Sequence, residues 1–341
     1  MTDILDSDEL ATRYRERGIR HDTRELLIAR IEGSEQAGDL TVPPNCGGYG
    51  RIRHFRLHQR SSLGRWMPNP LPITPACYAL RLPLTSELRA QAFQNAACNW
   101  RCWYCYVPFN LLAADERRAA WLTADELVER YARLSERPRI IDLTGGQPDL
   151  VPEWVPWTMR ALERQGLAQE VYLWSDDNLS NDYFWKYLST ADVETVASWP
   201  NYGRVCCFKG FDAASFSFNT AASGALFERQ FELFRRLLEL GLDLYAYVTL
   251  TTPDRDSIAQ GVPRFMDRLQ NIDPNLPLRT VPLEVQVFTP VRRRLTNART
   301  AALEHQYRAL EAFNLEVEQR FSSEMRALPI SEVPLGRRLR G

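Results

Sequence analysis

The sequence predicts an α/β fold in which a parallel sheet is wound into a partial or full barrel. Six short apolar segments with the character of strands occur between residues 90 and 288, and helix-like segments alternate with them. Right-handed crossovers between parallel strands curl such a sheet toward closure. Polar or glycine-containing motifs follow the first four strands, which is the end of the strands where barrel proteins place their sites.

Composition places the chain among ordinary globular proteins. It has 341 residues, enough for one large domain or two small ones, and a net charge of −1. The seven cysteines do not indicate a disulfide framework, because their number is odd and the chain is long. Residues 1–10 are acidic without an apolar run, and no stretch of about 18 apolar residues occurs. We therefore expect a cytoplasmic protein without a secretory signal or a membrane span.

Residues 1–72 are expected to form an N-terminal extension of helix, loop and basic segment. Asp8–Ile31 is charged with a short apolar stripe and is expected to be a helix, and the Gly, Pro and Asn of 41–50 indicate a loop. Arginines and histidines alternate with apolar residues in the basic segment, Arg51–Arg65. This segment is either a phosphate- or RNA-binding edge or, as we favour, a strand with a solvated basic face.

The barrel is expected to occupy residues 73–290, with residues 291–341 forming a C-terminal helix and a basic tail. Residues 73–84 alternate in polarity and contain prolines, which favours an extended edge segment. The six expected barrel strands are Ala90–Phe93, Ile140–Leu143, Val171–Trp174, Val205–Phe208, Leu244–Leu250 and Leu283–Phe288.

The intervening segments have helical periodicity and recognisable helix ends. Thr123 and Glu126 form a capping box at the start of the first of these helices. The expected helices are Thr123–Glu136, Glu153–Gln165, two short helices capped by Ser180 and Thr190, Ser223–Leu240, a helix broken by Gly261 and Pro263, and Asn297–Arg320.

Three cysteines follow the first strand as a CxxxCxxC triplet, Cys98, Cys102 and Cys105. Three thiolates within eight residues can converge on one inorganic centre. Structural zinc prefers four ligands, whereas an iron–sulfur cluster held by three thiolates keeps one position open. The alternative is three buried core cysteines, because free cysteine is often part of the core. Tyr104 adds an aromatic face beside the site.

With Tyr104 before its third cysteine, the triplet resembles the signature of the radical S-adenosylmethionine (radical SAM) superfamily. The resemblance covers about residues 85–290 and implies a partial (β/α)6 TIM-like barrel. It implies a [4Fe–4S] cluster on the three cysteines, with S-adenosylmethionine (SAM) on the open iron. It also implies reductive cleavage of SAM to methionine and a 5′-deoxyadenosyl radical, which takes hydrogen from a substrate. The cofactor performs such chemistry, and the protein supplies positioning. An electron donor such as flavodoxin or ferredoxin is expected.

Two further motifs support the resemblance and suggest contacts with the cofactor. Gly145-Gly146-Gln147-Pro148 resembles the family's GGEP motif, whose backbone contacts the methionine amino group, but Gln147 replaces the usual glutamate. Two glycines allow such a close approach, although an ordinary strand-end turn is the alternative. Ser175-Asp176-Asp177-Asn178 lies where family members bind the ribose hydroxyls, and a carboxylate can accept hydrogen bonds from a diol. Here the alternative is a turn that caps a helix.

Lys209 and the cysteines before it complete the candidate site. Lys209-Gly210-Phe211-Asp212 resembles the pyruvate formate-lyase activating-enzyme branch, in which a strand-four lysine points into the barrel, so Lys209 is a candidate catalytic residue. The alternative is a solvated strand end. Cys206 and Cys207 are adjacent in a strand and therefore face opposite sides, and we expect both in the core.

The resemblance predicts a radical SAM enzyme that acts on a small molecule or peptide. The sequence names no substrate. Three alternatives stay open: activation of a glycyl radical enzyme partner, modification of RNA bound through Arg51–Arg65, and a metal-binding module without catalysis. The net charge gives no general attraction to nucleic acid or to a membrane.

Overall fold

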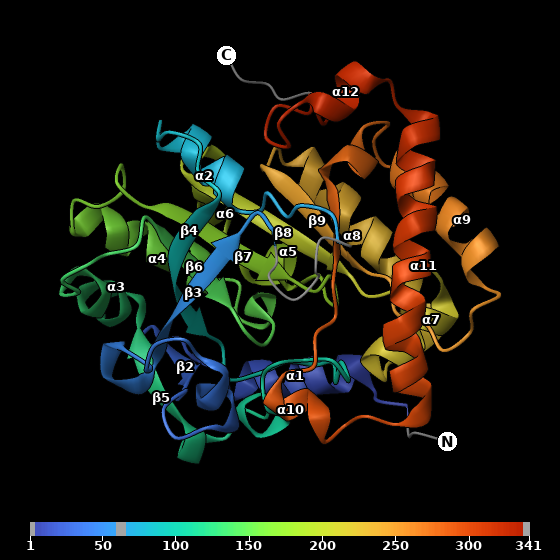
Figure 1. Ribbon diagram of the computed structural model, residues 1–341. Coiled ribbons are helices and arrows are strands. Elements are labelled where there is room, and N and C mark those ends of the chain that lie inside the picture. Colours follow the sequence, from blue (N-terminus) through green and yellow to red (C-terminus); the bar gives the residue numbers. More distant parts are fainter. Residues whose placement is uncertain (1–3, 59–65, 337–341) are drawn as a thin grey trace.

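A curled sheet of seven strands forms the centre of the protein (Figure 1), as seen in a computed structural model that describes residues 4–58 and 66–336. We call it the large sheet; its order is β10-β9-β8-β7-β6-β4-β3. Its strands are β3 (Gly50–Arg56), β4 (Glu87–Gln94), β6 (Ile140–Thr144), β7 (Tyr172–Asp177), β8 (Tyr202–Phe208), β9 (Leu244–Thr249) and β10 (Thr280–Leu283). Neighbours from β4 to β10 are parallel, whereas β3 is antiparallel to β4. The expected partial barrel of parallel strands is confirmed, and β3 adds a strand at its edge.

Helices connect the parallel strands and pack on the outer face of the sheet. They are α3 (Ala124–Ala132), α4 (Trp154–Arg164), α5 (Tyr183–Tyr187), α6 (Thr190–Ser198), α7 (Ala213–Thr220), α8 (Phe227–Glu239) and α9 (Ile258–Gln270). The predicted capping box is present: the Glu126 amide donates to the Thr123 hydroxyl at 3.1 Å, and the Glu126 carboxylate accepts from the Thr123 amide at 2.8 Å. Phe208 of β8 packs against Phe231 and Phe265, with ring centroids 5.0 and 5.6 Å apart. Such aromatic contacts join α8 and α9 to the sheet.

Three of these helices differ from expectation. Residues 258–270 form one continuous helix, α9, although a break at Gly261 and Pro263 was expected. Pro263 lies in the second turn, where it removes a single backbone hydrogen bond. Gly261 lies against the ring of Phe211, where a Cβ atom would clash. Helix α6 is capped by Ser189 rather than by Thr190. Helix α5 begins after Asp182 rather than after Ser180, and the side chain of Asp182 makes no capping hydrogen bond.

The N-terminal segment folds mostly as strands. Helix α1 (Ser7–Glu16) is followed by β1 (Ile19–Arg20) and β2 (Glu25–Ala29), so the expected helix 8–31 is wrong in its second half. Strand β2 pairs with β5 (Ala119–Thr123), and β1, β2 and β5 form a small sheet. The charged start of α1 gives a helical signal that ends at Glu16. The partner strand lies about ninety residues away, and sequence periodicity does not report such distant pairing.

Residues 73–79 form the helix α2 (Ile73–Ala79), so the expected extended segment 73–84 is wrong there. Ile73, Ala76 and Cys77 are buried at helical spacing. The alternation that suggested a strand continues through Leu80 and Leu82, which follow the helix in a region without regular structure. Burial of the helical set against the floor of the barrel decides the outcome.

The C-terminal segment ends the large sheet and then packs beside it. Strand β10 stops at Leu283, so the expected strand 283–288 is placed too late. The short helix α10 (Thr289–Arg292), the long helix α11 (Asn297–Arg320) and α12 (Ser323–Ala327) follow, and α11 has the expected bounds. In Figure 1, α11 runs along one side of the molecule near α9. None of the helices in the described ranges has the length and apolar character needed to span a bilayer.

The loop after β4 and the loop after β6 are packed backbone to backbone. The amide of Gln147 donates to the carbonyl of Ala97 at 2.8 Å, and the amide of Asn95 donates to the carbonyl of Thr144 at 3.2 Å. Gly146 has φ of +80°, and a Cβ atom there would lie under 3.0 Å from the carbonyl oxygens of Ala97 and Asn95. Only glycine fits this contact without movement of one loop.

We predict that Gly146→Ala lowers the free energy of unfolding by about 2–4 kcal/mol, because a left-handed backbone penalty adds to a steric clash. The matched control is Gly166→Ala, whose φ is +69° and whose Cβ would meet nothing within 4 Å. It carries the backbone penalty alone, about 1–2 kcal/mol. Urea denaturation of both variants measures the difference. Equal losses would mean that the two loops are not in close contact.

Candidate functional site

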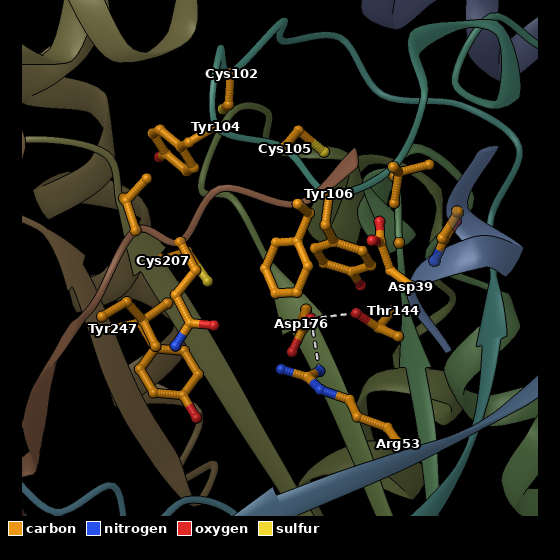
Figure 2. A pocket seen from close by; sticks show the side chains of 18 of the residues that line it. Asp39, Arg53, Cys102, Tyr104, Cys105, Tyr106, Thr144, Asp176, Cys207 and Tyr247 are labelled. Carbon is orange, nitrogen blue, oxygen red and sulfur yellow. Dashed lines mark hydrogen bonds and ion pairs between the residues drawn. The ribbon is translucent and has the colours of Figure 1, made fainter. Parts of the chain in front are cut away.

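A pocket of about 600 Å³ lies at the carboxyl-terminal ends of the parallel strands, and we call it the central pocket (Figure 2). Alternate residues of a strand face opposite sides of a sheet, so each strand contributes every second side chain to the pocket. Inward-facing side chains from five strands are Arg53 of β3, Thr144 of β6, Asp176 of β7, Cys207 of β8 and Tyr247 of β9. The loop that follows β4 closes another side of the pocket.

That loop contains the three cysteines of the triplet, and all three line the central pocket. The loop is fixed to the end of α7: the amide of Arg101 donates to the carbonyl of Thr220 at 3.0 Å, and the indole of Trp103 donates to the side chain of Asn219 at 3.1 Å. The phenol of Tyr104 lies 3.0 Å from the hydroxyl of Thr249, so Tyr104 also borders the pocket. The sequence prediction that the triplet borders one site agrees with this arrangement.

The cysteine sulfurs lie in a buried environment with three cations nearby, Arg101, Lys209 and Arg294. Burial raises the pKa of Cys98, Cys102 and Cys105, and the nearby ammonium of Lys209 opposes this rise. Burial would lower the pKa of Lys209, but Cys207, Tyr104 and the triplet raise it well above its ordinary value. The thiols therefore stay protonated until a metal centre replaces their protons.

The three thiols border one cavity without being drawn together around a single point. Within the described ranges, no group of three or more histidine, cysteine, aspartate or glutamate side chains is close enough to hold a single metal ion. The three thiols instead border a shared cavity, and the amide of Asn178 lies 3.7 Å from the sulfur of Cys98. Hydrogen bonds to ligand sulfurs are one of the means by which proteins set cluster potentials.

Gln147 joins the ends of three strands. Besides the contact with Ala97, its carbonyl accepts from the side chain of Asn95 at 2.7 Å. Its side-chain amide donates to Asp177 at 2.8 Å and accepts from the backbone of Asn178 at 2.9 Å. Gln147 is fully buried, and both the nitrogen and the oxygen of its side-chain amide make hydrogen bonds. Glutamate could not donate to the Asp177 carboxylate, which explains glutamine at this position.

The motif residues divide into those that line the pocket and those that support it. Gly145, Gly146, Gln147, Asp176, Asp177, Asn178 and Lys209 line it, whereas Pro148 and Ser175 do not. Pro148 begins a short 3-10 helix, Pro148–Leu150. Ser175 faces the outer side of the sheet, where its hydroxyl lies 2.7 Å from that of Tyr202.

Asp176 and Asp177 have different environments because they are adjacent in β7. Asp176 faces the pocket, accepts from the hydroxyl of Thr144 and has a buried Oδ1 without a partner. Asp177 is 3% exposed and forms a buried ion pair with Arg204 at 2.7 Å; Arg204 also pairs with Asp149. One carboxylate is therefore available to a ligand, and the other holds the loops in place.

The sequence analysis missed that the basic segment enters the pocket. The side chains of Arg51 and Arg53 lie inside the barrel, so the expected solvated face is wrong for these two residues. Arg56, on the same strand, pairs with Glu87 at 2.9 Å and is partly exposed. Arg60 and Arg65 lie outside the described residues. The alternation of Arg51, Arg53 and Phe55 was a usable signal, since one face of an edge strand must meet the barrel interior.

Arg53 neutralises two acids of the pocket. Its guanidinium lies 3.0 Å from Asp142 and 3.8 Å from Asp176 (Figure 2 shows the latter contact). Burial raises the pKa of Asp142 to about 7, although Arg53 opposes the rise. Cys206 and Cys207 are both buried on opposite faces of β8, as expected, and Cys207 on the inner face also borders the pocket. All seven cysteines are free thiols in the structure.

Comparison with known proteins identifies the superfamily. Residues 95–248 match the model of the "Radical SAM superfamily". SuiB of Streptococcus suis bound to the precursor peptide SuiA is 16% identical, with a TM-score of 0.37, 52% of this chain covered and 36% of SuiB. The protein anSMEcpe, with bound AdoMet and the Cp18Cys peptide, is 11% identical, with a TM-score of 0.39, 56% of this chain covered and 49% of anSMEcpe. The match thus spans about a third to a half of those chains. No curated relative matches the sequence. Residues 95–248 of this chain therefore form a domain of the radical SAM superfamily.

Proposed function

We propose that this enzyme uses a [4Fe–4S] cluster on Cys98, Cys102 and Cys105 to cleave SAM reductively and to abstract hydrogen from a substrate. When bound, the cluster supplies the electron that breaks SAM into methionine and a 5′-deoxyadenosyl radical. The electron comes from a donor such as flavodoxin or ferredoxin. The substrate is a small molecule or a peptide. The observation that supports this proposal best is that the triplet, the loop 145–148 and Asp176 border one pocket.

The residues of the chain have distinct tasks in this proposal. The glycines of the loop 145–148 let the backbone approach the methionine group closely. The free Oδ1 of Asp176 accepts a hydrogen bond from a ribose hydroxyl. Tyr104 and Lys209 border the space between the cluster and the rest of the pocket, and the positive charge of Lys209 balances part of the thiolate charge.

We predict that Cys102→Ala abolishes cluster assembly and SAM cleavage, because two thiolates cannot hold a four-iron cluster in place. Iron analysis and 5′-deoxyadenosine formation under anaerobic, dithionite-reduced conditions measure both. Cys46→Ala is the control: Cys46 lies outside the pocket in a short 3-10 helix, Cys46–Gly48. A Cys102→Ala protein with a full cluster would remove Cys102 from the ligand set. Wild-type protein that binds metal without cleaving SAM would instead favour the non-catalytic module.

We predict that Asp176→Asn and Asp177→Asn have different effects. Asp176→Asn weakens SAM binding about 10-fold, because a hydrogen bond to a charged acceptor contributes about 1.5–3 kcal/mol. Its effect on stability is small, since Arg53 keeps Asp142 as a partner. Asp177→Asn lowers the free energy of unfolding by about 3 kcal/mol, because buried Arg204 loses one of its two carboxylates. Equilibrium SAM binding and urea denaturation test the pair. Interchanged effects would assign the ribose contact to Asp177.

A further inference from the structure

Arg51 is a buried cation of the central pocket that forms no ion pair within 4 Å with any acid of the described residues, although the charge of Asp142 acts on it from farther away. The residue is 6% exposed and lines the pocket, and its buried Nε has no hydrogen-bond acceptor among the described residues. The ion pairs on this wall are made by its neighbour Arg53, which faces Asp142 and Asp176. Asp142 pairs directly with Arg53 and only partly compensates Arg51. Burial of a charge without a direct partner is unfavourable, so Arg51 is suited to bind an anion that enters the cavity.

The remaining charged groups of the pocket already have partners. Lys209 faces the sulfurs of the triplet, which carry negative charge once they bind a metal. Asp39 accepts hydrogen bonds from the backbone and hydroxyl of Thr289 at 3.0 and 2.8 Å. Glu284 accepts from the phenol of Tyr307 at 2.9 Å. The charge of Arg51 is therefore available to a ligand.

The side chain of Arg51 is held in position before any ligand binds. Its Nη2 donates to the phenol of Tyr106 at 2.9 Å, and its guanidinium carbon lies 5.1 Å from the centroid of that ring. The Tyr106 ring packs edge-on against Phe288 at 6.2 Å. The backbone of Arg51 is fixed by the pairing of β3 with β4. A donor that is already ordered loses little entropy on binding.

We propose that Arg51 binds a carboxylate or phosphate group of the substrate, which is therefore a small anionic molecule. The planar guanidinium pairs with either oxyanion through two parallel hydrogen bonds, and the buried position strengthens them. A small molecule fits because the guanidinium lies inside a cavity rather than on the surface. This inference rests on the proposed function, because it assigns the substrate class of the same pocket.

The test uses the anaerobically reconstituted protein with saturating SAM, titrated calorimetrically with inorganic phosphate and, separately, with succinate at low ionic strength. The wild type binds at least one probe, and the stronger probe identifies the group. Arg51→Gln weakens that binding about 10-fold or more, the effect of a lost charge-assisted hydrogen bond. Arg51→Lys retains part of the affinity, because it keeps the charge but not the fork of donors. The control Arg89→Gln binds as the wild type: Arg89 is exposed and pairs with Glu136.

Several outcomes would overturn the assignment. Failure of both probes to bind, or wild-type affinity in Arg51→Gln, removes the anion site. Loss of probe binding when SAM is added would make Arg51 a cofactor contact, which also overturns the proposal. If Arg51→Gln does not fold, Tyr106→Phe removes only the hydrogen bond that positions Arg51, and it weakens binding about threefold; unchanged affinity then counts against the site.

The two proposals fail separately. Formation of 5′-deoxyadenosine by the same preparation tests the proposed function, whereas the titration does not depend on cleavage. Cleavage without anion binding overturns only the substrate class. Anion binding without cleavage overturns the proposed function and keeps the oxyanion site on Arg51.

Discussion

The site depends on one buried residue, Gln147, whose backbone and side chain connect the loops after β4, β6 and β7. Its backbone bonds to the cysteine loop at Ala97 and Asn95, and its amide bonds to Asp177 and the amide of Asn178. These loops carry the thiols, the glycine pair and the pocket-facing carboxylate. Because each hydrogen bond is buried, loss of any partner would leave an unsatisfied polar group. The relative positions of the three motifs are therefore set together.

Buried charges of the large sheet are arranged in two separate groups. On the outer side of the sheet, Arg204 lies between Asp149 and Asp177, with its side chain 1% exposed. On the inner side, Arg53 lies between Asp142 and Asp176. Removal of one member from such a group lowers the free energy of unfolding strongly, although the complete group adds little net stability. The outer group holds Asp177 in place beneath the pocket, whereas the inner group keeps a carboxylate oxygen of Asp176 open to a ligand.

Local signals predicted the parts of this protein that depend on local interactions. The capping box of Thr123 and Glu126, the bounds of α11 and the cysteine triplet all follow from neighbouring residues. The secondary structures predicted for residues 17–31 and 73–84 were wrong, because distant residues decide the pairing with β5 and the burial on the barrel floor. The prediction that Arg51 and Arg53 face solvent was wrong for the same reason. A basic strand normally faces solvent, and only the position of β3 at the edge of the barrel turns one of its faces inward.

Some residues of the pocket lie within the segment that matches the superfamily, and others, including those of the edge strand β3, lie outside it. The segment that matches the superfamily, residues 95–248, contains the triplet, the glycine pair, Asp176 and Lys209. Arg51 and Arg53 come from β3 before that segment, and Leu283, Val285 and Phe288 come after it. Most of the pocket wall outside the matched segment is thus supplied by β3 and by residues from Leu283 onwards. Under the proposed function, the central segment performs hydrogen abstraction, while β3 and the stretch after β10 decide which molecule lies close enough to react.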